Sequence, residues 1–115
     1  MLIRSQDKAF LLNFNNLTAI YMKKIDKDFA IVYNDFEDAY TLGKYSTKAK
    51  AMKVLDMIQE AYEEYKITCT LLTGFTGHRA IVESNDIHVN GFKELVKNFK
   101  KNMVFQIPED SEVVV

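Results

Sequence analysis

Tyr40-Thr41-Leu42-Gly43-Lys44-Tyr45-Ser46-Thr47 leads from a strand-like segment into a long amphipathic helix, and this junction decides the fold. Alternation up to Leu42 is typical of a strand, Gly43 interrupts it, and Ser46 or Thr47 can cap the following helix. Apolar residues then recur at helical spacing, at Ala51, Val54, Leu55, Ile58, Ala61, Tyr62 and Tyr65. The pattern predicts a helix over 46–66 whose apolar face must dock on a sheet.

The segments before this helix predict the sheet. Short runs of apolar, aromatic and β-branched residues alternate with polar turns, which is typical of strands in a meander. The expected strands are 2–5, 10–14, 17–22, 29–33 and 39–42, with a polar connection at 23–28 and a turn at 34–38. The helix residues expected to cover one face of the sheet are Ala51, Leu55, Ile58 and Tyr62.

The segments after the helix predict further elements. The β-branched run 67–73 favours a strand, 73–78 a loop and 79–83 another strand. Asn90 can cap a second helix, and the alternating run 103–107 predicts a last strand that ends at Pro108. We therefore expect one domain, 1–115, of the α+β class: an antiparallel sheet of about five or six strands packed by one long central helix, with a second short helix near the C-terminus.

Composition narrows the class of protein. The chain has 115 residues, 48% of them hydrophobic, and a net charge of −1, so it can bury a core and lacks a strong overall attraction to nucleic acid. Cys69 is the only cysteine, which excludes an intramolecular disulfide. No apolar run approaches the roughly 18 residues of a membrane span, and the N-terminal segment reaches Asp7 too early for a signal peptide. We expect a cytoplasmic protein that does not enter membranes.

Several short blocks of the chain are similar to one group of proteins. The blocks are Ile3-Arg4-Ser5-Gln6, Leu12-Asn13-Phe14-Asn15-Asn16, Leu42-Gly43-Lys44-Tyr45-Ser46-Thr47, Val54-Leu55-Asp56-Met57-Ile58 and Val104-Phe105-Gln106-Ile107-Pro108. In these blocks the chain resembles small uncharacterised proteins of Firmicute genomes and their prophages. The resemblance implies a prophage context and makes 67–102 an insertion. It implies no activity and no site residues.

Catalytic chemistry has few candidates in the sequence. Cys69 with His78, His88 and Asp86 could supply a nucleophile and a base, but no catalytic cysteine signature surrounds them, and a packing cysteine is the better interpretation. The histidine spacing fits no zinc template. We therefore predict no enzyme activity, no catalytic residue and no cofactor.

Two loops could also be taken for ligand sites. Asn34, Asp35, Glu37 and Asp38 form an acidic run, which is too short for a calcium loop and suits a solvated hairpin turn. Gly74 and Gly77 lack the Lys-Ser/Thr sequence and the following helix of a phosphate-binding loop. The sequence therefore predicts turns at both places and no metal site.

The basic helix expected over 91–102 is the strongest binding candidate. Lys93, Lys97, Lys100 and Lys101 fall opposite Phe92, Leu95, Val96 and Phe99, and an acidic tail with Glu109, Asp110 and Glu112 follows. Such a lysine face can lie along a phosphate backbone, although it can also be an ordinary solvated surface near a helix C-terminus. The helix lacks arginine, so any nucleic-acid contact should be nonspecific.

Three functional hypotheses follow. The leading one is a noncatalytic cytoplasmic protein-interaction module, prophage-derived by resemblance, which binds a protein partner or itself through the strand edges at Leu2–Ser5 or Val104–Ile107. The alternative is a nucleic-acid-associated accessory protein that uses Lys93, Lys97, Lys100 and Lys101. A third, enzymatic hypothesis requires Cys69 to be exposed and reactive.

Overall fold

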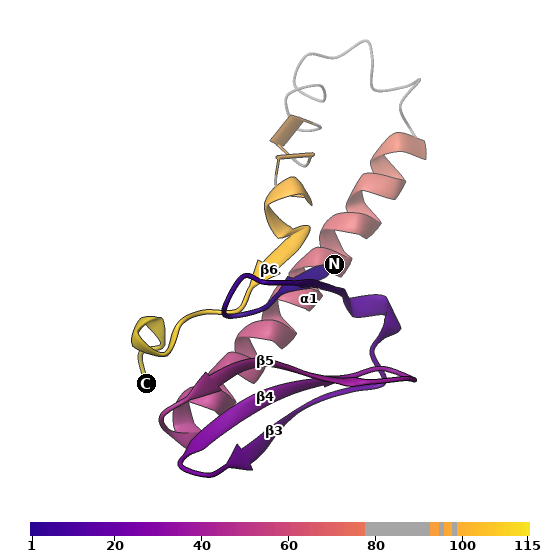
Figure 1. Cartoon of the computed structure of the whole chain (residues 1–115). Coiled ribbons are helices and arrows are strands. Elements are labelled where there is room, and N and C mark those ends of the chain that lie inside the picture. The colour runs from indigo at the N-terminus through magenta and orange to yellow at the C-terminus, as the bar shows by residue number, and fades with distance from the viewer. Residues whose placement is uncertain (78–92, 95, 98) are drawn as a thin grey trace.

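The computed structural model describes residues 1–77, 93, 94, 96, 97 and 99–115 (Figure 1). These residues form two three-stranded sheets beside one long helix, and the predicted α+β class is confirmed. The predicted strand 79–83 and the proposed helix cap Asn90 lie outside the described residues.

The strands β3 (Ala19–Ile25), β4 (Asp28–Asn34) and β5 (Ala39–Tyr45) form an antiparallel meander with β4 at its centre. A two-residue turn joins β3 to β4, and Asp26 in this turn has a φ of 53°, a left-handed conformation in which aspartate is enriched. The middle of β4, from Ala30 to Tyr33, is buried. The strand predicted at 29–33 is therefore confirmed, whereas the connection predicted at 23–28 is shorter because β3 continues to Ile25.

The second sheet places β1 (Leu2–Arg4) between β2 (Leu11–Asn13) and β6 (Val104–Gln106). β2 runs antiparallel to β1, and β6 runs parallel to it. The prediction of one sheet of five or six strands is wrong, since the described strands divide into two sheets. The physical reason is that β1 takes one neighbour from the far end of the chain, and no local pattern reveals such a pairing. Two short 3-10 turns, Phe14–Asn16 and Asp110–Glu112, complete the described elements.

The long helix α1 (Lys48–Gly77) starts where the sequence predicted. The hydroxyl of Thr47 accepts a hydrogen bond from the Lys50 amide at 3.2 Å, which identifies Thr47 as the capping residue. The helix does not stop at 66 but continues to Gly77. The strand predicted at 67–73 is therefore wrong, and so is the loop predicted at 73–78 for its residues up to Gly77. The hydroxyl groups of Thr68 and Thr70 donate to the backbone carbonyls four residues earlier, both at 2.9 Å, which accommodates these β-branched residues within a helix.

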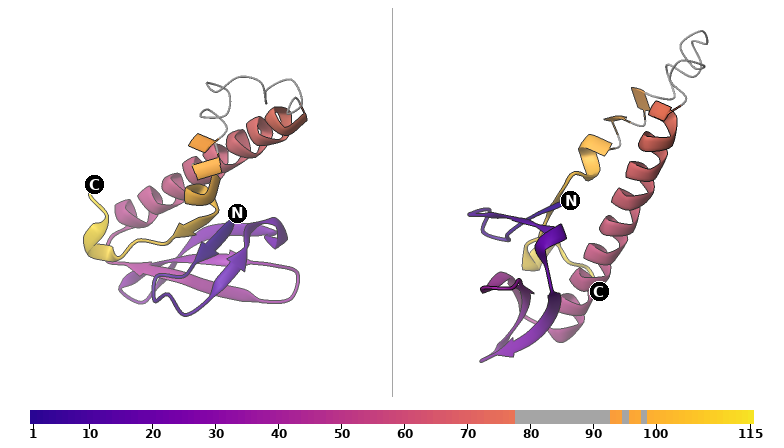
Figure 2. Two further views of the ribbon diagram at one scale, coloured as in Figure 1. Left: turned by 90° about the horizontal axis from the view of Figure 1, so that it is seen from above. Right: turned by 90° about the vertical axis from the view of Figure 1, so that its right-hand side faces the viewer.

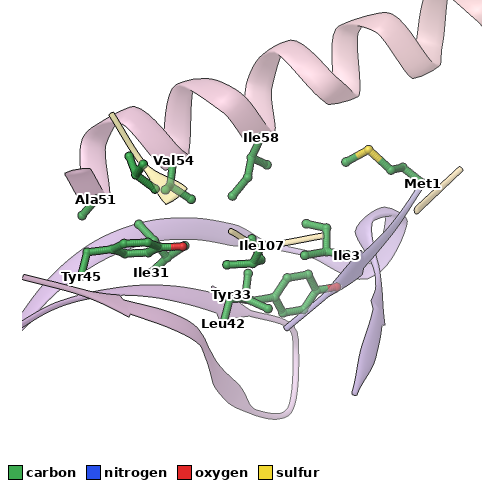
Figure 3. Packing of buried hydrophobic residues seen from close by; sticks show 11 residues of the cluster. Met1, Ile3, Ile31, Tyr33, Leu42, Tyr45, Ala51, Val54, Ile58 and Ile107 are labelled. Atoms are coloured by element: carbon green, nitrogen blue, oxygen red, sulfur yellow. The ribbon is translucent and has the colours of Figure 1, made fainter. Parts of the chain in front are cut away.

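The core lies between α1 and the two sheets (Figure 3). Its buried apolar residues are Met1, Ile3, Ile31, Tyr33, Leu42, Tyr45, Ala51, Val54, Ile58, Ile107 and Val113. Ala51 and Ile58 are buried as predicted, but Val54 is also buried whereas Leu55 and Tyr62 are only partly covered. Ile3 of β1 is buried, and so is Ile107, which directly follows β6, so the second sheet contributes to the same core as the meander.

The described residues between 93 and 102 are helical, which confirms a second short helix near the C-terminus. This segment lies beside the part of α1 that reaches beyond both sheets (Figure 2). The ring of Phe99 stacks on that of Tyr65 with centroids 5.8 Å apart, and the Asn102 amide donates to the Glu64 carboxylate at 3.1 Å. These contacts fix the C-terminal helical segment against α1.

Candidate functional site

The terminal strands of the two sheets are the places where another chain could add a strand. β3 is the longest open one: it has seven residues and pairs, among the described strands, with β4 alone. The turn between β3 and β4 makes Ile25 and Asp28 the first pair of the ladder. Because antiparallel hydrogen bonding alternates, the amide and carbonyl groups of Ile20, Met22 and Lys24 then point away from β4. We call this row of backbone groups the β3 edge.

The opposite edge of the same sheet is closed by the chain itself. The backbone amide of Gln6 donates to the Leu42 carbonyl at 2.7 Å. The Gln6 side chain accepts from the Lys44 amide at 2.9 Å and donates to the Lys44 carbonyl at 3.2 Å. One glutamine thus binds the Leu42 carbonyl and both backbone groups of Lys44 on the outer side of β5, while the β3 edge has no such cover from the described residues.

Of the two strand edges predicted as docking sites, one is not an edge in the structure and the other is short. Leu2–Ser5 was predicted as an exposed edge, and this is wrong because β1 lies between β2 and β6. Val104–Ile107 does contain a terminal strand, β6, but only three residues of it pair with β1. Ile107 itself is buried in the core. The second sheet therefore offers a much shorter template than β3.

The side chains of β3 divide into two faces. Ile20 and Met22 pack against the core cluster but stay partly exposed, since none of the described strands covers their outer side. Tyr21, 39% exposed, and Lys23 lie on the opposite, solvent-facing side. The Lys24 amine lies 5.8 Å from the centre of the Phe29 ring, a cation–π contact that holds this lysine over its own sheet.

The lysine face of the C-terminal helical segment is exposed. Lys93, Lys97, Lys100 and Lys101 all face solvent, whereas Val96 and Phe99 are half-buried. The predicted division into a basic side and an apolar side is confirmed for these residues, and Phe92 and Leu95 lie outside the description. Glu94 is exposed on the same segment, and Glu64 of α1 lies beside Asn102, so carboxylates border the lysine face.

Cys69 lies on α1 rather than on a strand and is half-buried. Its neighbour one helical turn earlier is Tyr65, and a hydrogen bond with Cys69 is the main reason why the pKa of Tyr65 is raised. His78, His88 and Asp86 lie outside the described residues.

The acidic turn between β4 and β5 is held by its own backbone. The Asp35 carboxylate accepts from the amides of Glu37 and Asp38 at 2.8 and 2.7 Å, and these bonds lower its pKa. Within 1–77 and the described residues from 93 onward, no group of three or more His, Cys, Asp or Glu residues is arranged to hold a metal ion. The turn is a structural Asx turn.

The acidic tail folds back onto the start of α1. The Asp110 carboxylate accepts from the Ser46 amide at 2.9 Å and from the Ser46 hydroxyl, and the Lys50 amine lies 3.4 Å away. The backbone amide of Ser46 is the main reason why the pKa of Asp110 is lowered. The acidic tail noted in the sequence thus has Asp110 bound beside the N-terminus of α1, where negative charge is favoured.

The chain matches no protein-family model, no curated protein and no solved structure in comparisons with known proteins. In the described residues, no helix combines the length and apolar character needed to cross a bilayer. Function is therefore inferred from the chain's own surfaces, and the β3 edge is the feature that sequence reasoning missed. The strand predicted at 17–22 ends three residues before Ile25, and its position at the end of a sheet was not visible in the sequence.

Proposed function

We propose that the protein is a noncatalytic protein-interaction module that binds its partner through the β3 edge. The observation that carries the proposal is the contrast between the two ends of the meander. Gln6 closes β5 with three hydrogen bonds, whereas the outward backbone groups of seven-residue β3 have no partner among the described residues. The docking site differs from the edges expected from sequence, but the class of function is the same.

An open edge of this length can template a further strand. Main-chain hydrogen bonds to Ile20, Met22 and Lys24 would supply affinity, and alternate side-chain contacts would supply specificity. An added strand would also cover the outer sides of Ile20 and Met22, which are the partly exposed members of the core cluster on β3. The binding chemistry is thus β-augmentation by an extended segment.

The proposal is tested by site-specific photo-crosslinking in the cells that make the protein. A photoreactive amino acid at Tyr21, on β3, should give a crosslinked product, whereas the same group at Thr41, exposed on the closed strand β5, should not. Ile20→Pro should abolish the product, since it removes an outward amide without removing a bond to β4. Equal crosslinking from both positions, or crosslinking unaffected by Ile20→Pro, contradicts the proposal.

A second candidate function rests on a separate observation, the exposure of all four lysines of the C-terminal helical segment. We propose as the alternative that Lys93, Lys97, Lys100 and Lys101 contact nucleic-acid phosphates without reading sequence. Four phosphate contacts on duplex DNA predict a slope of log affinity against log salt of about −3 to −4. The salt dependence is therefore the signature to measure.

The test is a titration with labelled single- and double-stranded DNA and RNA at about 50 and about 200 mM salt. Lys97, Lys100 and Lys101 are replaced together by glutamate in one variant. Lys27, Lys48 and Lys53, exposed elsewhere, are replaced by glutamate in the matched control. Loss of binding in the first variant alone supports the alternative, and absence of binding at the lower salt removes it.

A further inference from the structure

We propose that the partner at the β3 edge is a second copy of this chain, paired antiparallel about Met22. This inference rests on the proposed function and specifies its partner. It follows from the direction of the backbone groups of β3, from the strand's centre and from the positions of its two lysines.

The backbone of β3 is compatible with a two-fold axis at Met22. Met22 is the central residue of Ala19–Ile25, and its amide and carbonyl belong to the outward row. A two-fold axis through this position lets each Met22 exchange both hydrogen bonds with Met22 of the second copy. The same symmetry sets Ile20 opposite Lys24 of the second copy. All three residues whose backbone groups point away from β4 are then paired with residues of the second copy whose backbone groups also point outward.

The charges of β3 favour this register over those shifted toward Lys24. In the register about Met22, Lys23 lies opposite Tyr21 of the second copy and Lys24 lies opposite Ile20, so no lysine faces a lysine. A register about Lys24 would place the two copies of Lys24 directly opposite each other, which is destabilising. A register about Ile20 would pair fewer residues of the strand. Only the register about Met22 pairs all seven residues of β3 with the second copy and places no two lysines opposite each other.

The exposed faces complement each other in this arrangement. Tyr21 and Lys23 share the solvent-facing side of β3, so the symmetric pairing sets an ammonium group beside an aromatic ring twice. On the other side, Ile20 and Met22 of both copies form a continuous apolar strip next to the cores. The result is a six-stranded antiparallel sheet with both copies of α1 on one face.

A charge-swap series tests the partner and the register together. Dimer dissociation constants are measured by sedimentation, since the 13.3 kDa monomer and its dimer separate clearly. Tyr21→Lys sets lysine opposite Lys23 twice and should weaken the dimer about tenfold. Adding Lys23→Glu to Tyr21→Lys should restore the dimer, because each new lysine then faces a glutamate. Thr41→Lys adds the same charge on the closed strand and should leave the dissociation constant unchanged.

The outcomes separate this inference from the proposed function. A protein that stays monomeric at all concentrations, yet crosslinks from position 21 to a different protein, refutes the second copy and keeps the interaction module. A monomer without any crosslink from position 21 refutes both. A dimer insensitive to Tyr21→Lys, or not restored by Lys23→Glu in a variant whose circular dichroism is native, refutes the pairing about Met22.

Discussion

Gly43 of β5 packs closely against the side chains of Gln6 and Ile107, and Gly43→Ala tests that packing. The new Cβ would lie 3.1 Å from Cγ2 of Ile107 and 3.2 Å from Cβ of Gln6. Both distances are shorter than ordinary van der Waals contact. Ile107 is only 1% exposed, so it has little room to move away.

Two opposing effects set the size of the change. Overpacking a filled core costs roughly 1–3 kcal/mol, whereas Gly→Ala at a position with ordinary backbone angles stabilises by roughly 0.4–1 kcal/mol through the unfolded state. Gly43 does not have a positive φ, so the second effect operates in full. We expect the packing effect to be larger and the free energy of unfolding to fall by about 0.5–2 kcal/mol.

Urea unfolding followed by circular dichroism measures this difference directly. A second variant locates its cause: Ile107→Ala removes the Cγ2 atom that the new methyl group meets. Ile107→Ala alone should cost about 2–5 kcal/mol. In the Ile107→Ala background, Gly43→Ala should destabilise less, because only the contact with the Gln6 side chain remains. An unfolding free energy of Gly43→Ala equal to or above that of the unchanged protein would refute the close packing of Gly43 against Ile107 and Gln6.

Three further predictions concern α1 and its contacts. Ile58→Ala should lower the unfolding free energy by about 2–5 kcal/mol, whereas Ile67→Ala, at a side chain 61% exposed, should change it by less than about 0.5 kcal/mol in the same urea titration. Thr47→Ala removes the capping hydroxyl and should cost about 0.5–2 kcal/mol, measured as a lower thermal midpoint. The pKa of Asp110 is lower in the folded state, so this carboxylate contributes stability above its unfolded pKa, and the contribution disappears as pH falls through the folded pKa. Asp110→Asn should therefore flatten the acid limb of the stability profile, and a profile unchanged below about pH 4 would contradict the assignment.

Much of the fold could be predicted because it depends on residues that are close together in the sequence. The strand at β4 follows from its β-branched and aromatic residues, and the start of α1 follows from Thr47 and the spacing of Ala51, Val54 and Ile58. The end of α1 could not be predicted in this way. Thr68 and Thr70 favour strands by intrinsic preference, but in α1 their hydroxyls bond to the preceding turn and the helix continues.

The candidate site was harder to predict because an edge is defined by what does not pair with it. The exposure of Lys97 and Lys100 follows from helical spacing alone, and it was predicted correctly. The roles of β1 and β3 depend on contacts between distant parts of the chain. Leu2 meets Val104, and Gln6 meets Leu42, so β1 becomes central and β5 closed, which leaves β3 as the long open strand.

The parallel pairing of β1 with β6 has a consequence for the order of folding during synthesis. The meander β3–β4–β5 has only short turns and can form as soon as its residues leave the ribosome. β1 cannot gain its second neighbour until Val104 has been made, and the entropy of closing so long a loop must be overcome at that step. Ile3 therefore stays without its full set of native neighbours while the intervening chain is made. Of the six strands, the one translated first is completed last.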